Sequence, residues 1–372
     1  MKKILHIASF DGNIGDMANH KGFYDLLNEV VGKDYTIEQL EIRRFYNNSK
    51  ELQFDESFID YANKFDIIIF GGGAFLSLEW AYSKNGTTIN LGVEDLERIR
   101  TPIIFNDVTF KQTVRTTDVM RDNFKKFCEY CINCDNILFT IRNDGSHQRL
   151  QECYGKALAQ KAIVVPDGGF FVDIPNRIHD EYGNESYMTL NLAADHSFVN
   201  VEDNIKKIAQ VVEYYLHIRE GAMIFVPHIY KDLRCFAELT SYIDEKLLRN
   251  SICVAPLLTG KRFDGFHTLD IYREAEVNFG MRFHSNVCAI NLGIPTVGFG
   301  TQPVVQGVFD ELGISYRYIY GETFDVEYAI ELLNRVITNR ECVLKENKKI
   351  YESLYLARKQ YKDRLKEFLE RS

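Results

Sequence analysis

Arg282 and His284 stand two residues apart, directly after the apolar run Val277–Phe279 and Gly280. The pattern predicts a strand that ends at Gly280 and a helix that begins near Arg282. A guanidinium at the start of a helix adds fixed charge to the positive helix end, which suits a phosphate or a carboxylate. A histidine beside it can donate a hydrogen bond or transfer a proton. This segment, which continues with Ser285, therefore predicts an anion site that carries its own acid–base group.

The loop Asp11–Asp16 lies between the first apolar run and the first helical pattern. Gly12 and Gly15 allow backbone N–H groups to approach a ligand, and a helix N-terminus favours an anion. Asn13 and Gly15 are therefore candidate binding residues. The same loop is also typical of a tight structural turn in which Asp16 caps the helix.

Three consecutive glycines, Gly71, Gly72 and Gly73, follow the apolar run Ile67–Phe70. Glycines after a buried strand indicate close backbone approach to a ligand, and Gly72 and Gly73 are the candidates; a sharp structural turn is the alternative. Leu76 stands where the dinucleotide pattern G-x-G-x-x-G needs its third glycine, which argues against a nicotinamide or flavin cofactor.

Charged groups follow three further apolar runs. Arg142 and Ser146 span a strand-to-helix transition and can both face an anion, or Ser146 can cap the helix while Arg142 lies on the surface. Asp167 can act as a general base or organise its turn. His228 and Asp232 meet if a helix begins between them, which would orient the histidine through a carboxylate; a capping or core role for each is the alternative.

Composition excludes several classes of protein. The chain has 372 residues, of which 45% are hydrophobic and 26% charged, as in ordinary globular proteins. Its net charge of −9 opposes a broad nucleic-acid surface but allows a local basic pocket. Eight cysteines are too few for a disulfide scaffold. Cys128, Cys131 and Cys134 have metal-like spacing without an evident fourth ligand, so we interpret them as one face of a helix and predict no metal site.

Absent motifs narrow the chemistry further. The chain contains no Asp-x-Asp for a metal–diphosphate site, no G-x-x-x-x-G-K-[ST] loop and no G-x-S-x-G elbow. Phe75, Trp80 and Tyr82 follow the glycine run and can stack on sugar faces or simply pack.

Short apolar runs that alternate with helical patterns predict an α/β protein with parallel sheets. We predict two Rossmann-like domains, 1–178 and 186–340, joined by a polar linker at Asp173–Ser186, and a C-terminal amphipathic helix at 341–372. The predicted strands are Lys3–Ala8, Thr36–Glu41, Asp66–Phe70, Pro102–Phe105, Asn136–Thr140, Ala162–Val165, Tyr187–Leu192, Ala222–Pro227, Ile252–Ala255, Val277–Phe279 and Thr296–Phe299. The predicted helices include Met17–Val31, Glu94–Arg98, Thr117–Cys131, Gly145–Cys153 and Val201–Arg219.

No apolar run approaches the ~18 residues of a membrane span. The first strand is too short and polar for a signal peptide. We therefore expect a cytoplasmic protein, with peripheral contact at the inner face of the membrane as the most that the sequence allows.

Taken in order, these segments resemble the polysaccharide pyruvyl transferase family. The matching pieces are Gly12–Asp16, Gly71–Gly73, Ile141–Ser146, Val165–Phe170, Pro227–His228 with Asp232, Gly280–Ser285 and Gly293–Pro295. Gly168 and Gly169 depart from the expected pattern. The resemblance implies a glycosyltransferase B-like fold, in which two Rossmann-like domains face a cleft and the C-terminal helix crosses back to the first.

The implied reaction transfers pyruvate from phosphoenolpyruvate, a co-substrate, onto two hydroxyls of a free or lipid-linked sugar as a cyclic ketal, with release of phosphate and no cofactor. In this scheme Arg142 and Arg282 bind the donor, His284 is the general acid, and Asp16 or Asp167 is the base. The alternatives are a metal-independent nucleotide-sugar glycosyltransferase of the same fold and a non-catalytic relative that binds phosphate or sugar.

Overall fold

The computed structural model describes residues 1–49, 51–177, 179, 186–196, 198, 203–260 and 262–371. The chain forms two compact units that interleave along the sequence. Unit 1 comprises Met1–Phe10, Phe23–Asp167 and Tyr355–Ser372, and unit 2 comprises Asp11–Gly22 and Gly168–Leu354. The domains predicted from sequence order are contiguous, whereas in these units the first loop groups with the second half of the chain and the C-terminal helix is divided.

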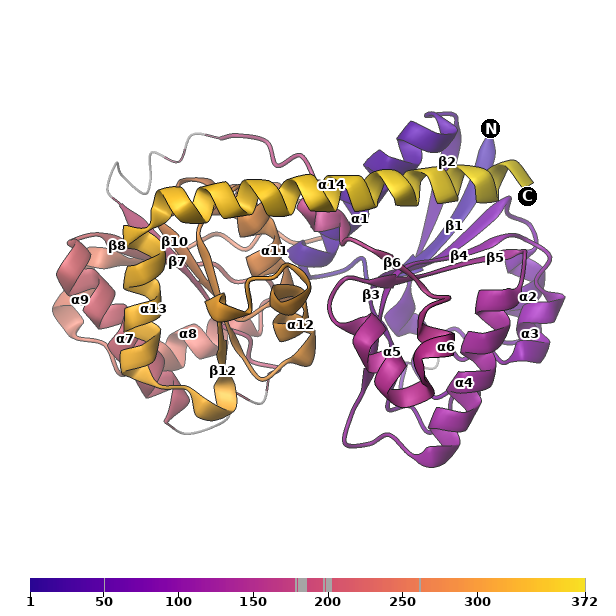
Figure 1. The fold of residues 1–372 in the computed structure, drawn as a ribbon, viewed down its shortest axis with the longest axis horizontal. Coiled ribbons are helices and arrows are strands. Elements are labelled where there is room, and N and C mark those ends of the chain that lie inside the picture. The colour runs from indigo at the N-terminus through magenta and orange to yellow at the C-terminus, as the bar shows by residue number, and fades with distance from the viewer. Residues whose placement is uncertain are drawn as a thin grey trace. The chain divides into compact units, whose positions relative to one another are not determined.

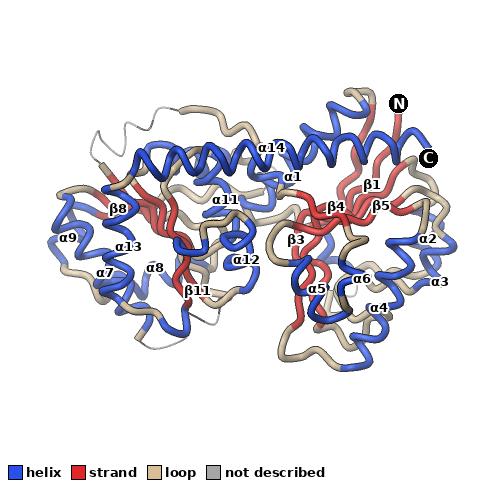
Figure 2. Tube along the Cα trace, viewed as in Figure 1, coloured by secondary structure: helices blue, strands red, loops and turns tan. Residues whose placement is uncertain are grey.

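Unit 1 is built on a parallel sheet whose strand order, over the residues described, is β2-β1-β3-β4-β5-β6. Its strands are β1 (Lys2–Ala8), β2 (Tyr35–Glu41), β3 (Ile67–Leu78), β4 (Ile103–Gln112), β5 (Ile137–Arg142) and β6 (Ile163–Val165). Its helices are the second half of α1 (Ile14–Val31), α2 (Glu56–Ala62), α3 (Val93–Arg98), α4 (Asp118–Asn133), α5 (Ser146–Tyr154), α6 (Lys156–Ala159) and the last part of α14 (Arg340–Arg371), with a 3₁₀ turn η1 (Ile42–Phe45). Figure 2 shows the strands in red with the helices in blue.

The two faces of the unit 1 sheet carry different helices, because alternate residues of each strand point to opposite faces. Leu5 and Ile68 face a core that also contains residues of α2, α3, α4 and α5. Ile4 and Ile69 face a second core, closed by α1 and by the end of α14. Cys128 and Cys131 are buried in the first core, as expected for one face of a helix.

Unit 2 has a second parallel sheet, with the strand order β12-β11-β10-β7-β8-β9 over the described residues. Its strands are β7 (Tyr187–Asn191), β8 (Ala222–Phe225), β9 (Ile252–Val254), β10 (Val277–Gly280), β11 (Thr296–Gly300) and β12 (Tyr318–Tyr320). Its helices are α7 (Asn204–Arg219), α8 (Asp232–Thr240), α9 (Glu245–Ser251), α10 (Phe266–Asp270), α11 (Phe283–Asn291), α12 (Pro303–Glu311), α13 (Val326–Thr338) and the first part of α14. The 3₁₀ turns are η2 (Gly168–Phe170), η5 (Ile271–Glu274), η6 (Ser315–Arg317) and η7 (Gly321–Thr323).

Helix α14, the long yellow helix of Figure 1, carries the predicted apolar stripe. Ile350 and Leu354 are buried in a core of unit 2, and Tyr361, Leu365 and Phe368 are buried in a core of unit 1. The stripe is therefore covered by protein, which fits the predicted amphipathic helix. In the described part of the chain, no helix combines the length and the apolar character that a bilayer span requires.

The α/β class and the parallel sheets confirm the predicted fold class, while some elements differ locally from the prediction. Strand β3 continues to Leu78, so the three glycines lie inside a strand and not in the predicted loop. Strand β12 has only three residues and was missed, because so short a run has no readable period. The predicted linker Asp173–Ser186 and the start of the predicted helix Val201–Arg219 fall partly outside the described residues.

Candidate active site

The order of the unit 2 sheet reverses between β7 and β10, which lie side by side. From β7 the chain runs outward to β8 and β9, and then returns to build β10, β11 and β12 on the other side. In open parallel sheets, ligands bind at the carboxyl ends of the strands where the order reverses. Asn191 and Gly280 pair in register at these two strand ends, so the residues that follow Gly280 stand at the expected position of a binding site.

The turn from β10 to α11 is held by amide side chains. Asn191 Oδ1 accepts a hydrogen bond from the N–H of Arg282 at 3.0 Å. Asn286 Nδ2 donates to the carbonyls of Gly280 and Arg282 at 3.0 and 2.9 Å. A Cβ at Gly280 would lie 2.5 Å from Ser285 Oγ, so only glycine fits there. These contacts fix Arg282 immediately before the first turn of α11.

Arg282 binds two carboxylates of unit 2. Its Nε and Nη2 donate to the two oxygens of Asp232 at 2.8 and 2.6 Å, and Nη2 also donates to Asp195 at 2.7 Å. Burial by itself lowers the pKa of Arg282, but the hydrogen bond and charge of Asp232, with those of Asp195, outweigh it and raise the pKa. The two partners differ in exposure, since the Asp232 side chain is fully buried and that of Asp195 is 47% exposed.

Asp232 does not orient His228 as the sequence suggested. Its Oδ2 accepts from the backbone N–H of His228 at 3.0 Å, while its carboxylate serves Arg282. The imidazole of His228 instead lies 2.9 Å from the hydroxyl of Tyr272, through Nε2. In place of the expected histidine–carboxylate pair, the structure has a histidine–tyrosine pair. The carboxylate of Asp232 forms its ion pair with the charged guanidinium of Arg282 instead.

His228 is completely buried, and its Nδ1 has no hydrogen-bond partner among the described residues. Burial, followed by the charges of Arg282 and His284, lowers the pKa of His228 well below its ordinary value of 6.5. The ring is therefore neutral near pH 7 and is a buried, uncharged neighbour of Arg282, not a cationic ligand for an anion.

His284 lies in the first turn of α11, next to the start of α1. Its Nδ1 is 3.8 Å from Oδ1 of Asp16. A Cβ on Gly15 would approach the Cβ of His284 to 2.5 Å, so glycine at this position is what lets the loop meet the histidine. The imidazole is 8% exposed and the Asp16 carboxylate 16%. Two residues that are 268 positions apart in the sequence thus form an acid–base pair that keeps a small opening to solvent.

Asn13 and Ser285 hold the backbone around this pair. Helix α1 begins at Ile14, and Asn13 Oδ1 accepts from the N–H of Gly15 at 2.9 Å, so Asn13 and not Asp16 takes the capping position. Ser285 Oγ donates to the carbonyl of Arg282 at 2.8 Å and is fully buried. This geometry does not favour the predicted binding role of Ser285, because its hydroxyl is bound to the backbone at the start of α11.

Unit 1 contains a second buried arginine. Arg142 Nε donates to Asp144 and Nη1 to Asp167, both at 3.1 Å, and Nη2 donates to the hydroxyl of Thr109 at 2.6 Å. Both carboxylates are fully buried. Burial alone would lower the pKa of Arg142, and the nearby carboxylates, Asp144 first, more than reverse this, so its pKa is raised. The guanidinium is engaged within its own unit, which does not favour its predicted role as a donor-binding group.

Asp167 and Ser146 belong to the same buried network. Asp167 accepts from Arg142, and its N–H donates to Asn143 Oδ1 at 3.1 Å. Ser146 Oγ donates to Asp144 at 2.6 Å. Asp167 thus organises the turn after β6, the structural alternative to a base, and Ser146 is bound at the start of α5 and not directed at a ligand.

The glycines of β3 have a packing reason. A Cβ on Gly71 would lie 1.9 Å from the carbonyl oxygen of Asn106 on β4, and one on Gly73 would collide with the ring of Phe75. Gly72 has a φ of +79°, which favours glycine. The run therefore allows β3 and β4 to pair closely around a register shift, and the predicted ligand contact through Gly72 and Gly73 has no support in this geometry.

The structure brings Asp16, Gly15, Asn13, His228, Arg282, His284 and Ser285 together in unit 2, and Arg142, Ser146 and Asp167 together in unit 1. Sequence reasoning missed Asn191, Asp195, Tyr272 and Asn286. The sequence did contain a signal for Asn191 as a site residue, because it is a polar residue at the end of the largely apolar strand β7. The sequence contained no such signal for Asp195 or Tyr272, since each contacts the site only because distant segments pack together. Within the described ranges, His, Cys, Asp and Glu side chains form no group of three or more that could hold a metal.

The geometry can now be set beside known proteins. The profile of the polysaccharide pyruvyl transferase family matches residues 13–303, which include Asn13, Asp16, Asp195, His228, Arg282 and His284. The chain belongs to this family. A search of curated proteins returned no match.

Solved structures of low sequence identity share the fold. The putative UDP-N-acetylglucosamine 2-epimerase from Listeria monocytogenes is 12% identical, with a TM-score of 0.60 over 100% of this chain and 97% of that one. The UDP-GlcNAc 2-epimerase from Methanocaldococcus jannaschii is 13% identical, with a TM-score of 0.55 over 91% and 93%. The trehalose 6-phosphate synthase from Burkholderia multivorans is 11% identical, with a TM-score of 0.53 over 100% and 98%. The fold is therefore glycosyltransferase B-like.

Proposed function

We propose that the protein transfers pyruvate from phosphoenolpyruvate onto two hydroxyls of one sugar, forming a cyclic ketal and releasing phosphate. The acceptor is a sugar unit of a cell-surface polysaccharide or of its lipid-linked precursor. Family membership supports the class of reaction. The observation that carries the proposal is the meeting of Arg282, His284 and Asp16 in unit 2, where an anion-binding group and an acid–base pair share one helix end.

The donor is bound by Arg282 and the N-terminus of α11. Phosphoenolpyruvate carries a carboxylate and a phosphate, and Arg282 directly precedes the positive end of the helix, so both act on the same ligand. The exposed carboxylate of Asp195 occupies Nη2 of Arg282 in the absence of donor. An oxyanion of the donor can replace Asp195 without leaving a buried carboxylate unpaired, because Asp195 then turns to water.

His284 acts as the general acid and Asp16 as the base. His284 delivers a proton to the methylene carbon C3 of the donor, which leaves an oxocarbenium-like centre at C2. One acceptor hydroxyl attacks C2 and gives its proton to Asp16. The C2–O bond to phosphate then breaks with its electron pair on the phosphate, which takes the proton held by Asp16 and leaves as hydrogen phosphate. The second hydroxyl closes the ring at C2 and returns a proton to His284. Asp167 is not assigned as the base, because its carboxylate is fully buried and pairs with Arg142.

Phosphorus NMR tests the proposal directly. The protein is incubated with phosphoenolpyruvate and a panel of free and lipid-linked glycosides in D₂O, and we expect orthophosphate to appear in step with a new ketal methyl signal. Because C3 receives its proton from an exchangeable group, each ketal methyl should carry one deuterium.

Arg282→Lys should retain the charge beside the buried Asp232 but lose the two-pronged contact, and so lose most donor affinity. Arg234→Ala, on the exposed side of α8, is the matched control. Unchanged turnover and donor affinity in Arg282→Lys would remove Arg282 from the scheme. Release of a nucleoside diphosphate from a nucleotide sugar, with no orthophosphate from any acceptor tested, would replace the proposed reaction with glycosyl transfer.

A further inference from the structure

Unit 1 has a surface pocket of about 740 Å³ that none of the site residues lines. Its walls come from the segment that follows η1, from the connection between β3 and α3, and from α3 itself. Tyr46 and Tyr82 line it, together with the polar side chains of Asn47, Gln53, Asn90 and Arg98. The volume lies in the range of small-molecule sites, ~300–1,000 Å³.

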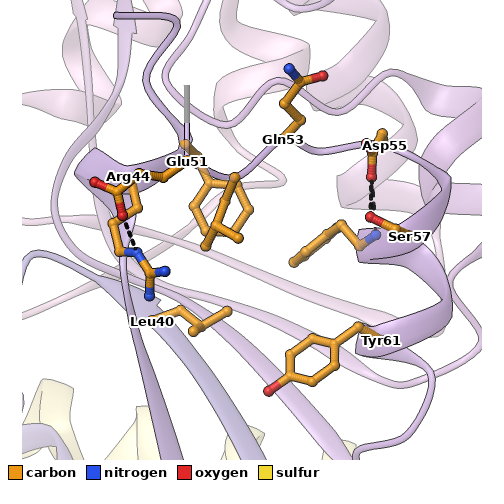
Figure 3. A pocket seen from close by; sticks show the side chains of 10 residues that line it. Leu40, Arg44, Glu51, Gln53, Asp55, Ser57 and Tyr61 are labelled. Atoms are coloured by element: carbon orange, nitrogen blue, oxygen red, sulfur yellow. Dashed lines mark hydrogen bonds and ion pairs between the residues drawn. The ribbon is translucent and has the colours of Figure 1, made fainter. Parts of the chain in front are cut away.

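A second pocket of about 550 Å³ adjoins the first. Phe45, Leu52, Gln53 and Asp55 line both, so the segment 52–55 separates two hollows of one surface. Figure 3 shows the second hollow, with the Arg44–Glu51 pair on one side, Asp55 and Ser57 on the other, and Tyr61 below. The two hollows together offer room for an elongated ligand rather than for a single compact one.

Aromatic rings stand at the first pocket. The ring centroid of Trp80 lies 4.8 Å from that of Tyr46 and 5.8 Å from that of Tyr82. Tyr82 is 38% exposed, whereas Phe75, from the same predicted aromatic group, is buried in the core. Trp80 Nε1 is buried and has no hydrogen-bond partner among the described residues, so the ring is held by packing against the two tyrosines. Tyr46 and Tyr82, each packed against Trp80, therefore supply aromatic lining to this pocket.

The polar groups of the pocket suit a neutral ligand. Its two cations are already paired, Lys84 Nζ with Asp95 at 2.6 Å and Arg98 with Glu56. With Asp55 added, the acidic groups outnumber the basic ones, which opposes a phosphate or a carboxylate. The side-chain amides of Asn47, Gln53 and Asn90 offer both donors and acceptors, which is what a hydroxyl-rich ligand requires.

We propose that this surface binds neutral sugar units of a glycan chain. A sugar ring has an apolar face that packs on an aromatic side chain, and a rim of hydroxyls that pairs with amides and with fixed carboxylate and guanidinium groups. The pocket supplies both, at a size that exceeds one ring. As an extended binding site for the acceptor this inference rests on the proposed function, whereas glycan binding itself is measured without any donor present.

The binding of sugars to this surface can be followed by NMR through Trp80, because it is the only tryptophan of the chain. Its indole N–H contributes one resonance to a ¹H–¹⁵N spectrum, behind the two tyrosines of the pocket. The full chain is titrated with neutral tetrasaccharides of glucose, galactose, mannose and N-acetylglucosamine, and separately with inorganic phosphate. We expect a saturable shift of the Trp80 resonance with at least one tetrasaccharide and none with phosphate.

Tyr82→Ala and Gln53→Ala should each weaken that binding about fivefold or more, measured by calorimetry so that the reporter itself is not involved. Both side chains are surface groups, so the fold should survive. Tyr355→Ala is the matched control, since Tyr355 belongs to unit 1, is 54% exposed and does not line either pocket.

Orthophosphate release by the same variants separates the two proposals. Sugar binding that Tyr82→Ala weakens, without phosphate release from any acceptor, would support the pocket and overturn the transfer reaction. Phosphate release with no Trp80 shift by any tetrasaccharide, or with wild-type affinity in both pocket variants, would overturn the pocket and leave the reaction standing. A shift produced by phosphate and not by the tetrasaccharides would also overturn it.

Discussion

Each unit holds a buried arginine between two aspartates, and the two arrangements differ first in the exposure of those aspartates. Arg142 binds Asp144 and Asp167, both fully buried, whereas Arg282 binds the buried Asp232 and the half-exposed Asp195. Releasing Asp167 from Arg142 would separate a fully buried carboxylate from its guanidinium, at a cost of several kcal/mol. Releasing Asp195 transfers it to water. The exposure of the partner, and not the presence of an arginine, therefore separates a structural ion pair from one that can exchange for a ligand.

The neighbours of the two arginines differ as well. Beside Arg282 stand the buried His284 and the slightly more exposed Asp16, which are the proposed acid and base. Beside Arg142 stand Thr109 and Ser146, whose hydroxyls are bound to carboxylates of the same network. The groups that the proposed reaction needs therefore lie in unit 2, while the unit 1 network holds the turns after β5 and β6.

The largest effect should come from His284→Gln. The glutamine can still form a hydrogen bond but cannot deliver a proton to C3, so kcat should fall by about 10²–10⁴-fold while donor affinity changes little. Steady-state phosphate release and calorimetry with phosphoenolpyruvate measure the two quantities. His217→Gln, an exposed histidine on α7, is the control. A kcat within a few-fold of the wild type would exclude His284 as the acid.

Arg142→Met should act on stability instead. It removes the guanidinium from two fully buried carboxylates, of which Asp144 keeps its ion pair with Arg149, and the free energy of unfolding should fall by ~3–5 kcal/mol. Urea denaturation measures the loss, with Arg121→Met on the surface of α4 as the control. If Arg142→Met kept its stability and lost donor binding, the contrast between the two arginines would be wrong.

Asp195→Asn should strengthen donor binding. The substitution removes a carboxylate that competes for Nη2 of Arg282, and, since exposed ion pairs contribute ~0.2–1 kcal/mol, the dissociation constant for phosphoenolpyruvate should fall by about two- to fivefold. Calorimetry measures it, with Asp203→Asn, an exposed carboxylate of unit 2, for comparison. Weaker binding would show that Asp195 supports Arg282 rather than competing for it.

The smallest effect concerns pH. His228 has a lowered pKa in the folded state, so below its ordinary value of 6.5 the unfolded chain binds a proton that the folded chain does not. Stability should therefore be full above pH 6.5 and decline as the pH falls below it. Hydrogen exchange at pH 5.5 and 7, corrected for intrinsic rates, should show this loosening around β7, β10 and α8 more than around β4 and β5. His228→Asn should reduce this difference in hydrogen exchange between pH 5.5 and 7. An unchanged difference would show that His228 is not the group responsible.

The sequence by itself determined the elements and the order of the motifs. Runs such as Ile67–Phe70, short and followed by glycines, favour strands buried on both faces, and local spacing places Arg282 and His284 near one helix start. The family followed from that order, because the motifs lie at successive strand ends.

Only the tertiary structure decided what each charged residue does. Arg142 and Arg282 each follow a predicted strand and each fit an anion site, and they differ in the exposure of their aspartate partners and in the groups beside them. The carboxylate of Asp232 pairs with Arg282 and not with the imidazole of His228. Asp16 lies beside His284, although the two are 268 positions apart in the sequence. The glycines of β3 allow this strand to pair closely with β4. Burial and the choice of a partner depend on segments far apart in the chain, so no local pattern can specify them.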